Sequence, residues 1–383
     1  MKKRLVILGS SGSIGKSALD VVEKNIDRIE VVGLSVHSNI DLLRDQIARF
    51  KPKYVAVTDP DAYRQFRNSS QADDIRLFKA ETGVEELAGL EEADIVLNAV
   101  VGAAGLTASL KTVLAGKRLA LANKESMVIG GPLINEAAAR TGAEIIPVDS
   151  EHSAIWQALF AGQKREIKKI ILTGSGGPFR DVPLSEFDKI TREQALSHPT
   201  WKMGPKITID SATMMNKGLE ILEAMHLFQV PIDKIDVVIH PQSVIHSMVE
   251  FIDSSIIAQL SSPDMRLPIA YALFFPERVA GNNGYIDLTE VGKLNFYKPD
   301  YEKFILLKLA FKVARSGGTT AAVYNAANEV AVAAFLKETI EFRAIPDIII
   351  NTVEKHKPAE KPNLEDIFEA DRWARKVALE IMR

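Results

Sequence analysis

Cysteine is absent from this 383-residue chain, and its absence excludes three kinds of chemistry at once. Without a thiol there is no disulfide framework, no thiolate metal site and no cysteine nucleophile. An excess of charge of one sign is also lacking, because 47 Lys and Arg oppose 50 Asp and Glu and leave a net charge of −3. This balance gives no electrostatic reason to expect nucleic acid or an anionic membrane as a partner.

Long apolar runs are missing as well. The basic start at residues 2–4 leads into an apolar stretch far too short for a signal peptide, and no segment approaches the ~18 apolar residues of a membrane span. We therefore expect a cytoplasmic protein. Hydrophobic residues make up 46% and charged residues 25%, as in ordinary globular proteins. The length exceeds the ~250–300 residues at which single cores stop growing, so two or three domains are expected.

The pattern along the chain predicts an α/β protein in several parts. Residues 1–149 alternate short β-branched runs with amphipathic stretches, which predicts a Rossmann-like NADPH-binding domain. Residues 150–275 predict an α+β domain with a mobile lid at about 175–205. Residues 276–301 are predicted to be a linker and 302–383 a C-terminal helical bundle, with breaks at Pro346 and near 357–362. Strands are expected at 5–8, 31–32, 54–57, 95–97, 118–121, 145–148, 170–172, 237–239 and 256–260.

A glycine-rich turn follows the first predicted strand. Gly9, Gly12 and Gly15 precede a predicted helix over 16–24, which is the context in which a dinucleotide pyrophosphate meets a helix N-terminus. The spacing GxxGxxG differs from the commoner GxGxxG, so a tight turn without a ligand is the plainer alternative. After the second strand, residues 37–39 lack the carboxylate that favours NAD, so the sequence favours NADP.

Residues 215–228 predict a helix with one buried stripe, formed by Leu219, Leu222, Met225 and Leu227 or Phe228. Asn216 and Lys217 would lie in its first turn, where unpaired backbone N–H groups and the lysine charge attract an anion. This predicts a substrate with a phosphate at one end. Glu220 lies on the same face as Lys217, and a carboxylate beside a phosphate is repelled unless a cation intervenes. Glu220 is therefore a metal-ligand candidate, with an ordinary first-turn glutamate as the alternative.

Acidic residues also follow the last strand of the first domain. Asp149 and Glu151 alternate, so in extended backbone both would emerge on one side at the carboxyl edge of the sheet. With Glu220 they make a three-carboxylate site suited to a hard cation that keeps water or substrate oxygens, hence Mg²⁺ or Mn²⁺. Capping of the next helix by Asp149 or Ser150 is the alternative.

Further segments are candidates for the same pocket. Residues 172–179, which include Ser175, follow a strand and offer backbone N–H groups and hydroxyls to a phosphate. Residues 198–205 combine a hinge-like Gly and Pro with Trp201, as a lid that excludes water requires, although Trp201 could equally pack in a core. Lys124 could polarise a carbonyl near the nicotinamide or simply form a salt bridge.

Eight motifs occur in order along the chain, at residues 9–15, 122–126, 148–155, 174–179, 198–201, 210–220, 240–247 and 325–330. From end to end they resemble the 1-deoxy-D-xylulose 5-phosphate reductoisomerase family. The resemblance implies an enzyme of non-mevalonate isoprenoid biosynthesis that uses NADPH and one divalent ion, Mg²⁺ or Mn²⁺, per subunit. Its substrate, a phosphorylated ketose, is rearranged to an aldehyde and reduced to 2-C-methyl-D-erythritol 4-phosphate. It also implies a homodimer of three-domain subunits, in which residues 150–275 form the catalytic and dimerisation domain.

The resemblance assigns residues to each ligand. The metal is assigned to Asp149, Glu151 and Glu220, and the reacting end of the substrate to Lys124, Ser150 and Glu151. The substrate phosphate is assigned to Ser175, Ser211, Asn216 and Lys217, with His198 nearby and Trp201 on the lid. NADPH contacts are implied for Ser11, Gly12, Ser13, Ile14, Asn39, Asn123, Glu125 and Gly204, with Met203 and Met265 near the nicotinamide.

One turn departs from the family pattern. His37 and Ser38, which we also expect at the cofactor, stand where many members have a Gly-Lys-Asn type turn. The missing lysine leaves the margin of NADPH over NADH open.

Two other functions remain open. A semialdehyde or glyceraldehyde-phosphate type dehydrogenase, acting with NADP on a phosphorylated substrate, would share the glycine loop, but it needs a cysteine nucleophile. A non-catalytic NADP-binding regulator would explain the first domain without explaining three carboxylates beside a phosphate site.

Overall fold

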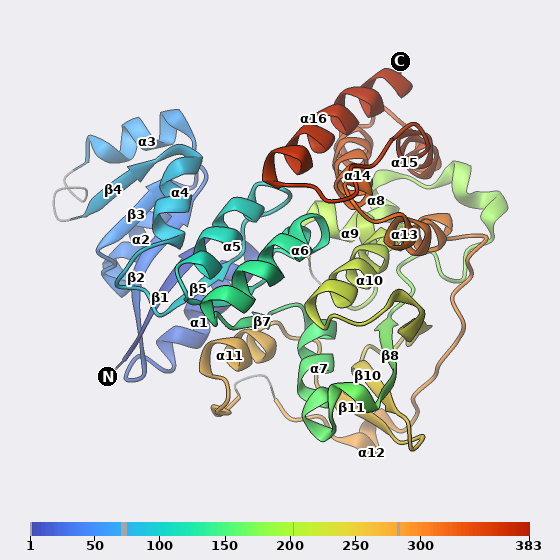
Figure 1. Cartoon of the computed structure of the whole chain (residues 1–383), viewed down its shortest axis with the longest axis horizontal. Helices are drawn as coiled ribbons and strands as arrows, with labels where there is room; N and C mark the ends of the chain where they lie inside the picture. The colour runs from blue at the N-terminus through green and yellow to red at the C-terminus, as the bar shows by residue number, and fades with distance from the viewer. Residues whose placement is uncertain (1, 70–74, 202, 282–283) are drawn as a thin grey trace. The chain divides into compact units, whose positions relative to one another are not determined.

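The computed structural model describes residues 2–69, 75–201, 203–281 and 284–383 (Figure 1). The chain divides into two compact units, each described here by itself. The first comprises Met1–Ser126, Pro132–Ser153 and Asp264–Asn283, and the second comprises Met127–Gly131, Ala154–Pro263 and Gly284–Arg383. Lys202 of the predicted lid and residues 282–283 of the predicted linker lie outside the described residues. The four predicted domain ranges stay a prediction, although packing groups residues 264–275 with the N-terminal part.

A seven-stranded parallel sheet forms the centre of the first unit. Its order is β4 (Arg76–Lys79), β3 (Tyr54–Val57), β2 (Ile29–Val36), β1 (Lys3–Leu8), β5 (Ile95–Asn98), β6 (Arg118–Leu121) and β7 (Ile145–Pro147). The chain builds outward from β1 to β4 and then returns to β5 on the other side of β1. The strand order thus reverses between β1 and β5, at the point where ligands bind in open sheets of this kind. The predicted fold class is confirmed.

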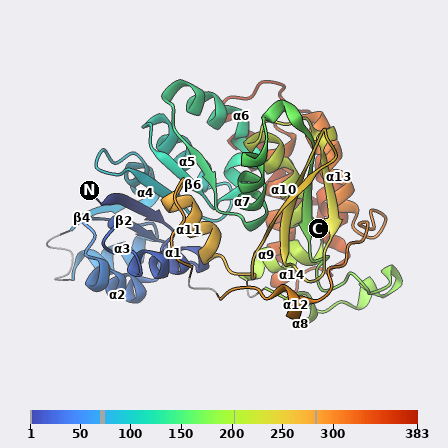
Figure 2. The same cartoon turned by 90° about the horizontal axis from the view of Figure 1, so that it is seen from below.

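Helices connect the parallel strands of this sheet. They are α1 (Ser13–Glu23), α2 (Ile40–Phe50), α3 (Pro60–Arg67), α4 (Ala80–Ala88), α5 (Gly105–Leu114) and α6 (Lys124–Thr141). The first unit also contains α11 (Arg266–Phe274), which connects no two of these strands. Local chemistry sets several of their ends: Asp59 caps α3 ahead of Pro60, and Asn123 caps α6. Helix α11 enters from a distant part of the sequence and packs beside α1 (Figure 2).

A buried apolar layer fixes the sheet to the helices on one face. Residues of five strands, including Val6, Val32 and Val96, cluster with Val84 and Leu87 of α4. Strand β4 was not predicted, because its four residues include two charged ones and it lies at the edge of the sheet.

The second unit contains a four-stranded sheet and a helical bundle. The sheet order is β11 (Ile256–Leu260), β10 (Ile245–Phe251), β8 (Ile167–Gly174) and β9 (Ile235–Ile239). Among the described strands of this sheet, β8 and β9 are parallel and the other neighbours are antiparallel. Strand β10 was not predicted, because its buried residues include His246 and Ser247 and hide the apolar alternation. Short 3-10 helices lie at Leu159–Ala161, Lys164–Glu166, Leu184–Lys189 (η4) and Ile232–Lys234.

The remaining helices are α7 (Ser150–Ala158), α8 (Arg192–Ala195), α9 (Pro205–Ala212), α10 (Met215–Leu227), α12 (Leu288–Val291), α13 (Ile305–Ser316), α14 (Thr320–Leu336), α15 (Ala344–Glu354) and α16 (Leu364–Ile381). Helices α14, α15 and α16 pack on one another at the C-terminal end (Figure 1). The break predicted at Pro346 falls slightly earlier, because this residue lies in the first turn of α15, where proline is tolerated. Among the described residues, no helix is both long and apolar enough to cross a bilayer.

Candidate functional site

The glycine loop lies at the carboxyl end of β1, next to the point where the strand order reverses. Gly9 has φ +83° and a side chain there would lie 2.7 Å from the carbonyl oxygen of Ala99. A Cβ on Gly15 would lie 2.5 Å from backbone atoms of residues 9 and 10, so only glycine fits. Helix α1 begins at Ser13, earlier than the predicted residue 16, with Gly12 as its N-cap. The Gly12 N–H donates to the Gly9 carbonyl oxygen at 3.1 Å, while Ser13 and Ile14 lie in the first turn of the helix, where an anion is attracted.

The carboxyl end of β2 supports this loop and carries the predicted cofactor turn. The Ser35 hydroxyl accepts a hydrogen bond from the Gly9 N–H at 2.9 Å. His37, Ser38 and Asn39 follow directly and are exposed. The Asn39 side chain caps α2 by accepting from the Leu42 N–H at 3.1 Å. Its oxygen is thus already engaged, and His37 Nδ1 lies 2.8 Å from the Thr58 hydroxyl.

At the end of β6, the Asn123 side chain is also committed to structure. Its oxygen caps α6 by accepting from the Ser126 N–H at 2.9 Å, and its Nδ2 donates to the carbonyl oxygens of Val100 and Gly102 at 2.7 and 2.9 Å. Glu125 is 6% exposed and contacts the same Nδ2 at 3.2 Å. Its backbone N–H also donates to the Asn98 carbonyl oxygen at 2.9 Å, so Asn123 holds the loop after β5 in place.

Lys124 and Asp149 each show the structural role that was considered as an alternative: Lys124 forms a salt bridge, and Asp149 caps a helix. Lys124 Nζ forms a salt bridge with Asp149 Oδ2 at 3.0 Å, and both side chains are nearly buried. The other oxygen of Asp149 accepts from the Glu151 N–H at 3.0 Å and contacts His152 Nδ1 at the same distance. Asp149 thus caps α7, and the backbone after β7 is helical. The expectation of an extended segment with alternating carboxylates is wrong, since the cap starts a helix at Ser150.

Glu151 lies in the first turn of α7. Its Oε2 accepts a hydrogen bond from the Ser150 hydroxyl at 2.5 Å. A negative side chain at this position is favoured by the helix dipole. Asp149 and Glu151 therefore lie at one helix start in the first unit, with Lys124 beside them.

Helix α10 in the second unit carries buried charges. Lys217 is 4% exposed and Glu220 is 1% exposed, and their side chains form a salt bridge. The Asn216 amide also donates to Glu220. The predicted single buried stripe is wrong: Met225 is only half-buried, whereas Lys217, Glu220 and Glu223 are buried with the apolar residues, because the helix is surrounded by protein. Burying charges is costly unless they are paired, so removing either Lys217 or Glu220 would leave an uncompensated buried charge.

Backbone segments that are far apart in sequence meet beside Lys217. A Cβ on Gly174, at the end of β8, would lie 3.0 Å from Lys217 Cε. Gly177 has φ +68°, and a Cβ there would lie 2.6 Å from the carbonyl oxygen of Ser211. The loop after β8, the end of α9 and the start of α10 are therefore in contact. We call the predicted phosphate-binding residues at this place the polar cluster: Ser175, His198, Ser211, Asn216 and Lys217.

The hydrogen bonds of His198 indicate which of its ring nitrogens carries the proton. The N–H groups of Thr200 and Trp201 donate to Nδ1 at 3.1 and 2.9 Å, so the neutral ring carries its proton on Nε2. That nitrogen lies 3.1 Å from the Ser175 hydroxyl, which also accepts from the Gly177 N–H at 3.2 Å. The Ser175 oxygen receives two donors, and its own proton is directed to a further acceptor. Burial lowers the pKa of His198, which favours this neutral form.

Packing narrows the predicted lid. Phe179 and Phe187 are buried and contact Phe342 of the C-terminal bundle, with ring centroids 5.2 and 5.9 Å apart. Arg343 forms a salt bridge with Asp188 at 2.9 Å. Residues 179–188 of the predicted lid are thus attached to the bundle, and the lid at about 175–205 otherwise stays a prediction. Trp201 in it is half-buried, with its ring 6.1 Å from that of His246.

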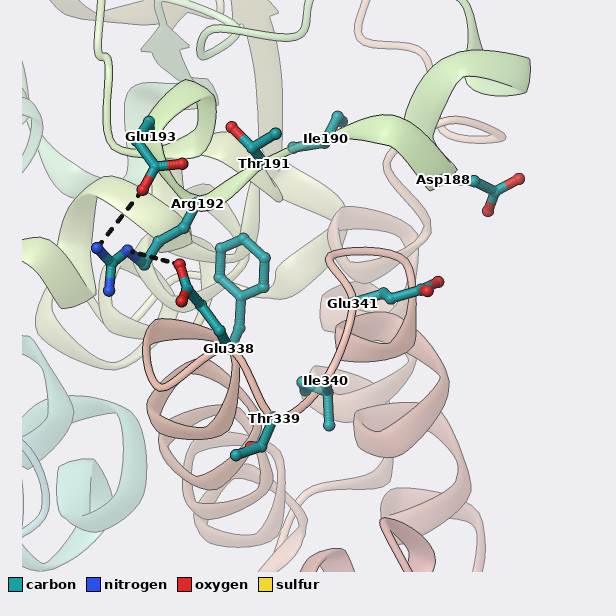
Figure 3. Close-up of a pocket in the computed structure, with 10 residues that line it drawn as sticks. Asp188, Ile190, Thr191, Arg192, Glu193, Glu338, Thr339, Ile340 and Glu341 are labelled. Carbon is teal, nitrogen blue, oxygen red and sulfur yellow. Dashed lines mark ion pairs between the residues drawn. The ribbon is translucent and has the colours of Figure 1, made fainter.

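A cavity of about 460 Å³ lies where this attached segment meets the bundle (Figure 3). Arg192 points toward Glu338 there, with 3.4 Å between Nε and the carboxylate, and also contacts Glu193. Its NH1 donates to the Leu336 carbonyl oxygen at 3.2 Å. These contacts tie α8 to the end of α14. The cavity therefore lies between these two helices, and no residue of the polar cluster lines it.

Gly204 and the two methionines complete the predicted set. Gly204 is exposed and caps α9. Met203, in the second unit, and Met265, in the first, are half-buried. Sequence reasoning assigned no role to Asp210, Tyr324 or Asn328. In the structure Asn328 bonds to Asp210 of α9, and Tyr324 lies against Gly218 of α10. A buried acid next to Ser211 was the available signal, but its partner lies 118 residues away.

The first unit defines the class: an open parallel α/β sheet with a glycine loop at its switch point is a dinucleotide-binding protein. Comparison with known proteins then places the chain within that class. It belongs to the 1-deoxy-D-xylulose 5-phosphate reductoisomerase family. The family model of that name matches residues 5–131, its C-terminal domain matches 145–228, and the DXP reductoisomerase C-terminal domain matches 260–377.

Relatives agree over the whole chain. The 1-deoxy-D-xylulose 5-phosphate reductoisomerases of Endomicrobium trichonymphae and Thermodesulfovibrio yellowstonii are 50% and 49% identical, each over 98% of both chains. The solved structure of the Zymomonas mobilis enzyme in complex with NADPH is 42% identical, with a TM-score of 0.93 and full coverage of both chains. A DOX-P reductoisomerase in complex with NADPH, fosmidomycin and magnesium is 41% identical, with a TM-score of 0.93 over 99% of this chain and 98% of that one.

Proposed function

We propose that this protein converts 1-deoxy-D-xylulose 5-phosphate to 2-C-methyl-D-erythritol 4-phosphate in isoprenoid biosynthesis, with NADPH as reductant and a divalent cation. Membership of the family, at about half identity over nearly the whole chain, carries the proposal. Each ligand also has a matching group of residues: a glycine loop for the dinucleotide, carboxylates for the cation, and the polar cluster for the phosphate.

The cofactor takes the glycine loop of the first unit in this proposal. Ser11 to Ile14 meet the pyrophosphate at the start of α1, and residues 37–39 meet the adenosine ribose and its 2′-phosphate. Asn123, Glu125 and Gly204 touch the cofactor further along, with Met203 and Met265 near the nicotinamide. Hydride transfer belongs to the cofactor, so the protein supplies orientation and excludes water.

The cation takes Asp149, Glu151 and Glu220, which are among the described groups of side chains that could hold a metal ion. Three carboxylates that leave positions for substrate oxygens suit Mg²⁺ or Mn²⁺. When bound, such an ion neutralises negative charge that develops on substrate oxygens. Lys124 and Ser150 then face the reacting end of the substrate. Lys124 forms a salt bridge with Asp149, and in this proposal its ammonium group stabilises charge on a substrate oxygen.

The polar cluster takes the substrate phosphate. The Ser175 hydroxyl accepts from two donors, so its proton points to a phosphate oxygen. Lys217 supplies a full positive charge, and the start of α10 supplies backbone N–H groups. Trp201, on the candidate lid, covers the bound substrate. Phosphate binding supplies remote binding energy that holds the reacting end in place.

The homodimer belongs to the proposal as well, with β11 at the interface. This strand lies at an edge of its sheet and exposes Ile256, Ile257 and Leu260, of which Ile256 is 52% exposed. An edge strand with exposed apolar side chains is suited to pairing with another chain. Sedimentation of the wild type and of Ile257→Lys tests it: a wild type that sediments as a monomer contradicts the dimer. The cytoplasmic location stays a prediction.

Turnover of the named substrate decides the function. Purified protein, Mg²⁺ and 1-deoxy-D-xylulose 5-phosphate should oxidise NADPH and yield 2-C-methyl-D-erythritol 4-phosphate. A dehydrogenase for another phosphorylated substrate would bind NADPH but leave this ketose unchanged. A non-catalytic regulator would bind NADPH but would not oxidise it, whichever phosphorylated ketose or aldehyde was added.

A further inference from the structure

Helix α14 presents two buried polar residues on one face. Tyr324 and Asn328 lie four residues apart, so their side chains project from the same side of the helix. Both are 0% exposed. The proposed roles of the active-site residues use neither of them, although both point toward the helices that carry the polar cluster.

Asn328 reaches the helix that precedes the cluster. Its Nδ2 donates to Asp210 Oδ1 in the last turn of α9 at 2.8 Å. Asp210 is 1% exposed, and its other oxygen forms a salt bridge with Lys206 at 2.9 Å. The Oδ1 of Asn328 accepts no hydrogen bond from the residues that the structure describes. Burying an amide with an unsatisfied oxygen is unfavourable. The hydrogen bond to Asp210 is therefore the favourable interaction that the Asn328 side chain makes here.

Tyr324 reaches the helix that carries Lys217. A Cβ on Gly218 would lie 2.5 Å from the Tyr324 hydroxyl oxygen, so the phenol fits against the α10 backbone only because residue 218 is glycine. The hydroxyl donates to the Leu306 carbonyl oxygen at 2.9 Å. Burial and then the nearby charge of Asp210 raise the pKa of Tyr324, which keeps the phenol neutral.

The connection between the two helices is itself strained. Met214 joins α9 to α10 with φ +59°, a left-handed conformation that is costly for a residue with a side chain. Such a conformation persists where surrounding contacts fix it. Helix α14 is in turn anchored to α16, because Arg375 bridges Glu329 and Asp371 at 2.6 Å each.

We infer that Tyr324 and Asn328 are positioning residues for the polar cluster. Asn328 fixes Asp210, the neighbour of Ser211, while Tyr324 fixes Gly218, the neighbour of Lys217. One helix of the C-terminal bundle thereby sets the spacing between the two segments that grip a phosphate. The inference rests on the proposed phosphate role of the cluster. A displacement of about 1 Å is already costly for catalytic geometry. Releasing either contact therefore weakens phosphate binding without removing any group that touches the substrate.

Kinetics of Asn328→Ala test this, with Thr352→Val as the matched control. Thr352 is equally buried in the bundle, donates to the Ile348 carbonyl oxygen at 2.7 Å, and lies on α15. For Asn328→Ala we expect the KM for 1-deoxy-D-xylulose 5-phosphate and the inhibition constant of inorganic phosphate to rise together, by roughly 10-fold, as for a hydrogen bond to a charged group. The Kd for NADPH should stay within 2-fold. The control should change neither.

Asn328→Asp sets a second carboxylate against Asp210 and should raise both constants further. If Asn328→Ala does not fold, Asn328→Ser is measured in its place. A rise in KM without a matching rise in the phosphate constant, or an equal rise in Thr352→Val, would overturn the inference. Absence of turnover in the wild type would instead overturn the proposed function, and the inhibition constant would then be replaced by calorimetric phosphate binding.

Discussion

Lys217 is the residue whose charge matters most for the proposed substrate. It is buried, and its salt bridge with Glu220 offsets the cost of burying it. We expect Lys217→Ala to raise the KM for the phosphorylated ketose by about 100-fold, the loss of a charge-assisted contact to phosphate. The Kd for NADPH should stay unchanged, because the glycine loop belongs to the other unit.

Steady-state kinetics and a fluorescence titration of NADPH measure the two effects of Lys217→Ala separately. Lys164→Ala, an exposed lysine of the same unit, is the control. Equal weakening of ketose and NADPH binding would contradict a phosphate role for Lys217.

His198 makes substrate binding depend on pH. Its pKa is lowered from the usual 6.5 by burial, so folding favours the neutral ring. The contribution of the neutral ring is complete above pH 6.5 and is lost as the pH falls through the lowered pKa. Protonation of Nδ1 would displace the two N–H donors from Thr200 and Trp201 and loosen the candidate lid. The KM for the ketose should therefore rise in acid, while the Kd for NADPH stays level.

A phosphate monoester also gains a proton near pH ~6, which would itself weaken binding. The KM profile of His198→Asn separates the two causes, because only the substrate titrates in that variant. Identical profiles for wild type and variant would rule out the histidine as the source.

Among the elements, the turn between β1 and α1 has the narrowest tolerance. Gly15→Ala would place a Cβ 2.5 Å from the Ser10 Cα, where no flexible side chain can yield. We expect the Kd for NADPH to rise at least about 10-fold, because a shifted turn moves the helix N-terminus away from the pyrophosphate. Gly89→Ala, with its nearest neighbour at 3.7 Å, is the matched control. Unchanged NADPH binding in Gly15→Ala would show that the cofactor does not use this loop.

Elements with a local pattern could be predicted from sequence, and contacts between them could not. The central strands of the parallel sheet and helix α10 have apolar periodicity, so their positions were expected. Edge strand β4 and the polar strand β10 lack that signal and were missed. The capping role of Asp149 was foreseen as an alternative to metal binding, and the cap turned the expected extended segment into a helix. The bond from Asn328 to Asp210 joins residues 118 apart, which no local pattern encodes.

At the scale of the whole molecule, the proposal brings carboxylates that are far apart in the sequence to one cation. Asp149 and Glu151 follow β7, and Glu220 lies on α10. A chelator should abolish turnover and leave NADPH binding intact, since the glycine loop contains no carboxylate. Loss of NADPH binding on chelation would place the cation elsewhere.

Substitutions of two of these carboxylates then test the proposed metal site. Asp149→Asn and Glu220→Gln should each lower kcat/KM by at least about 100-fold, because a metal site with one ligand removed loses both affinity and geometry. Binding of Mn²⁺, followed by electron paramagnetic resonance, should weaken in both variants, which separates metal loss from damage to the reaction. Glu91→Gln and Asp233→Asn remove exposed acids from the first and second unit and serve as controls. If either active-site variant kept its activity within a few-fold of the parent, the cation could not depend on that carboxylate, and its assignment as a metal ligand would fail.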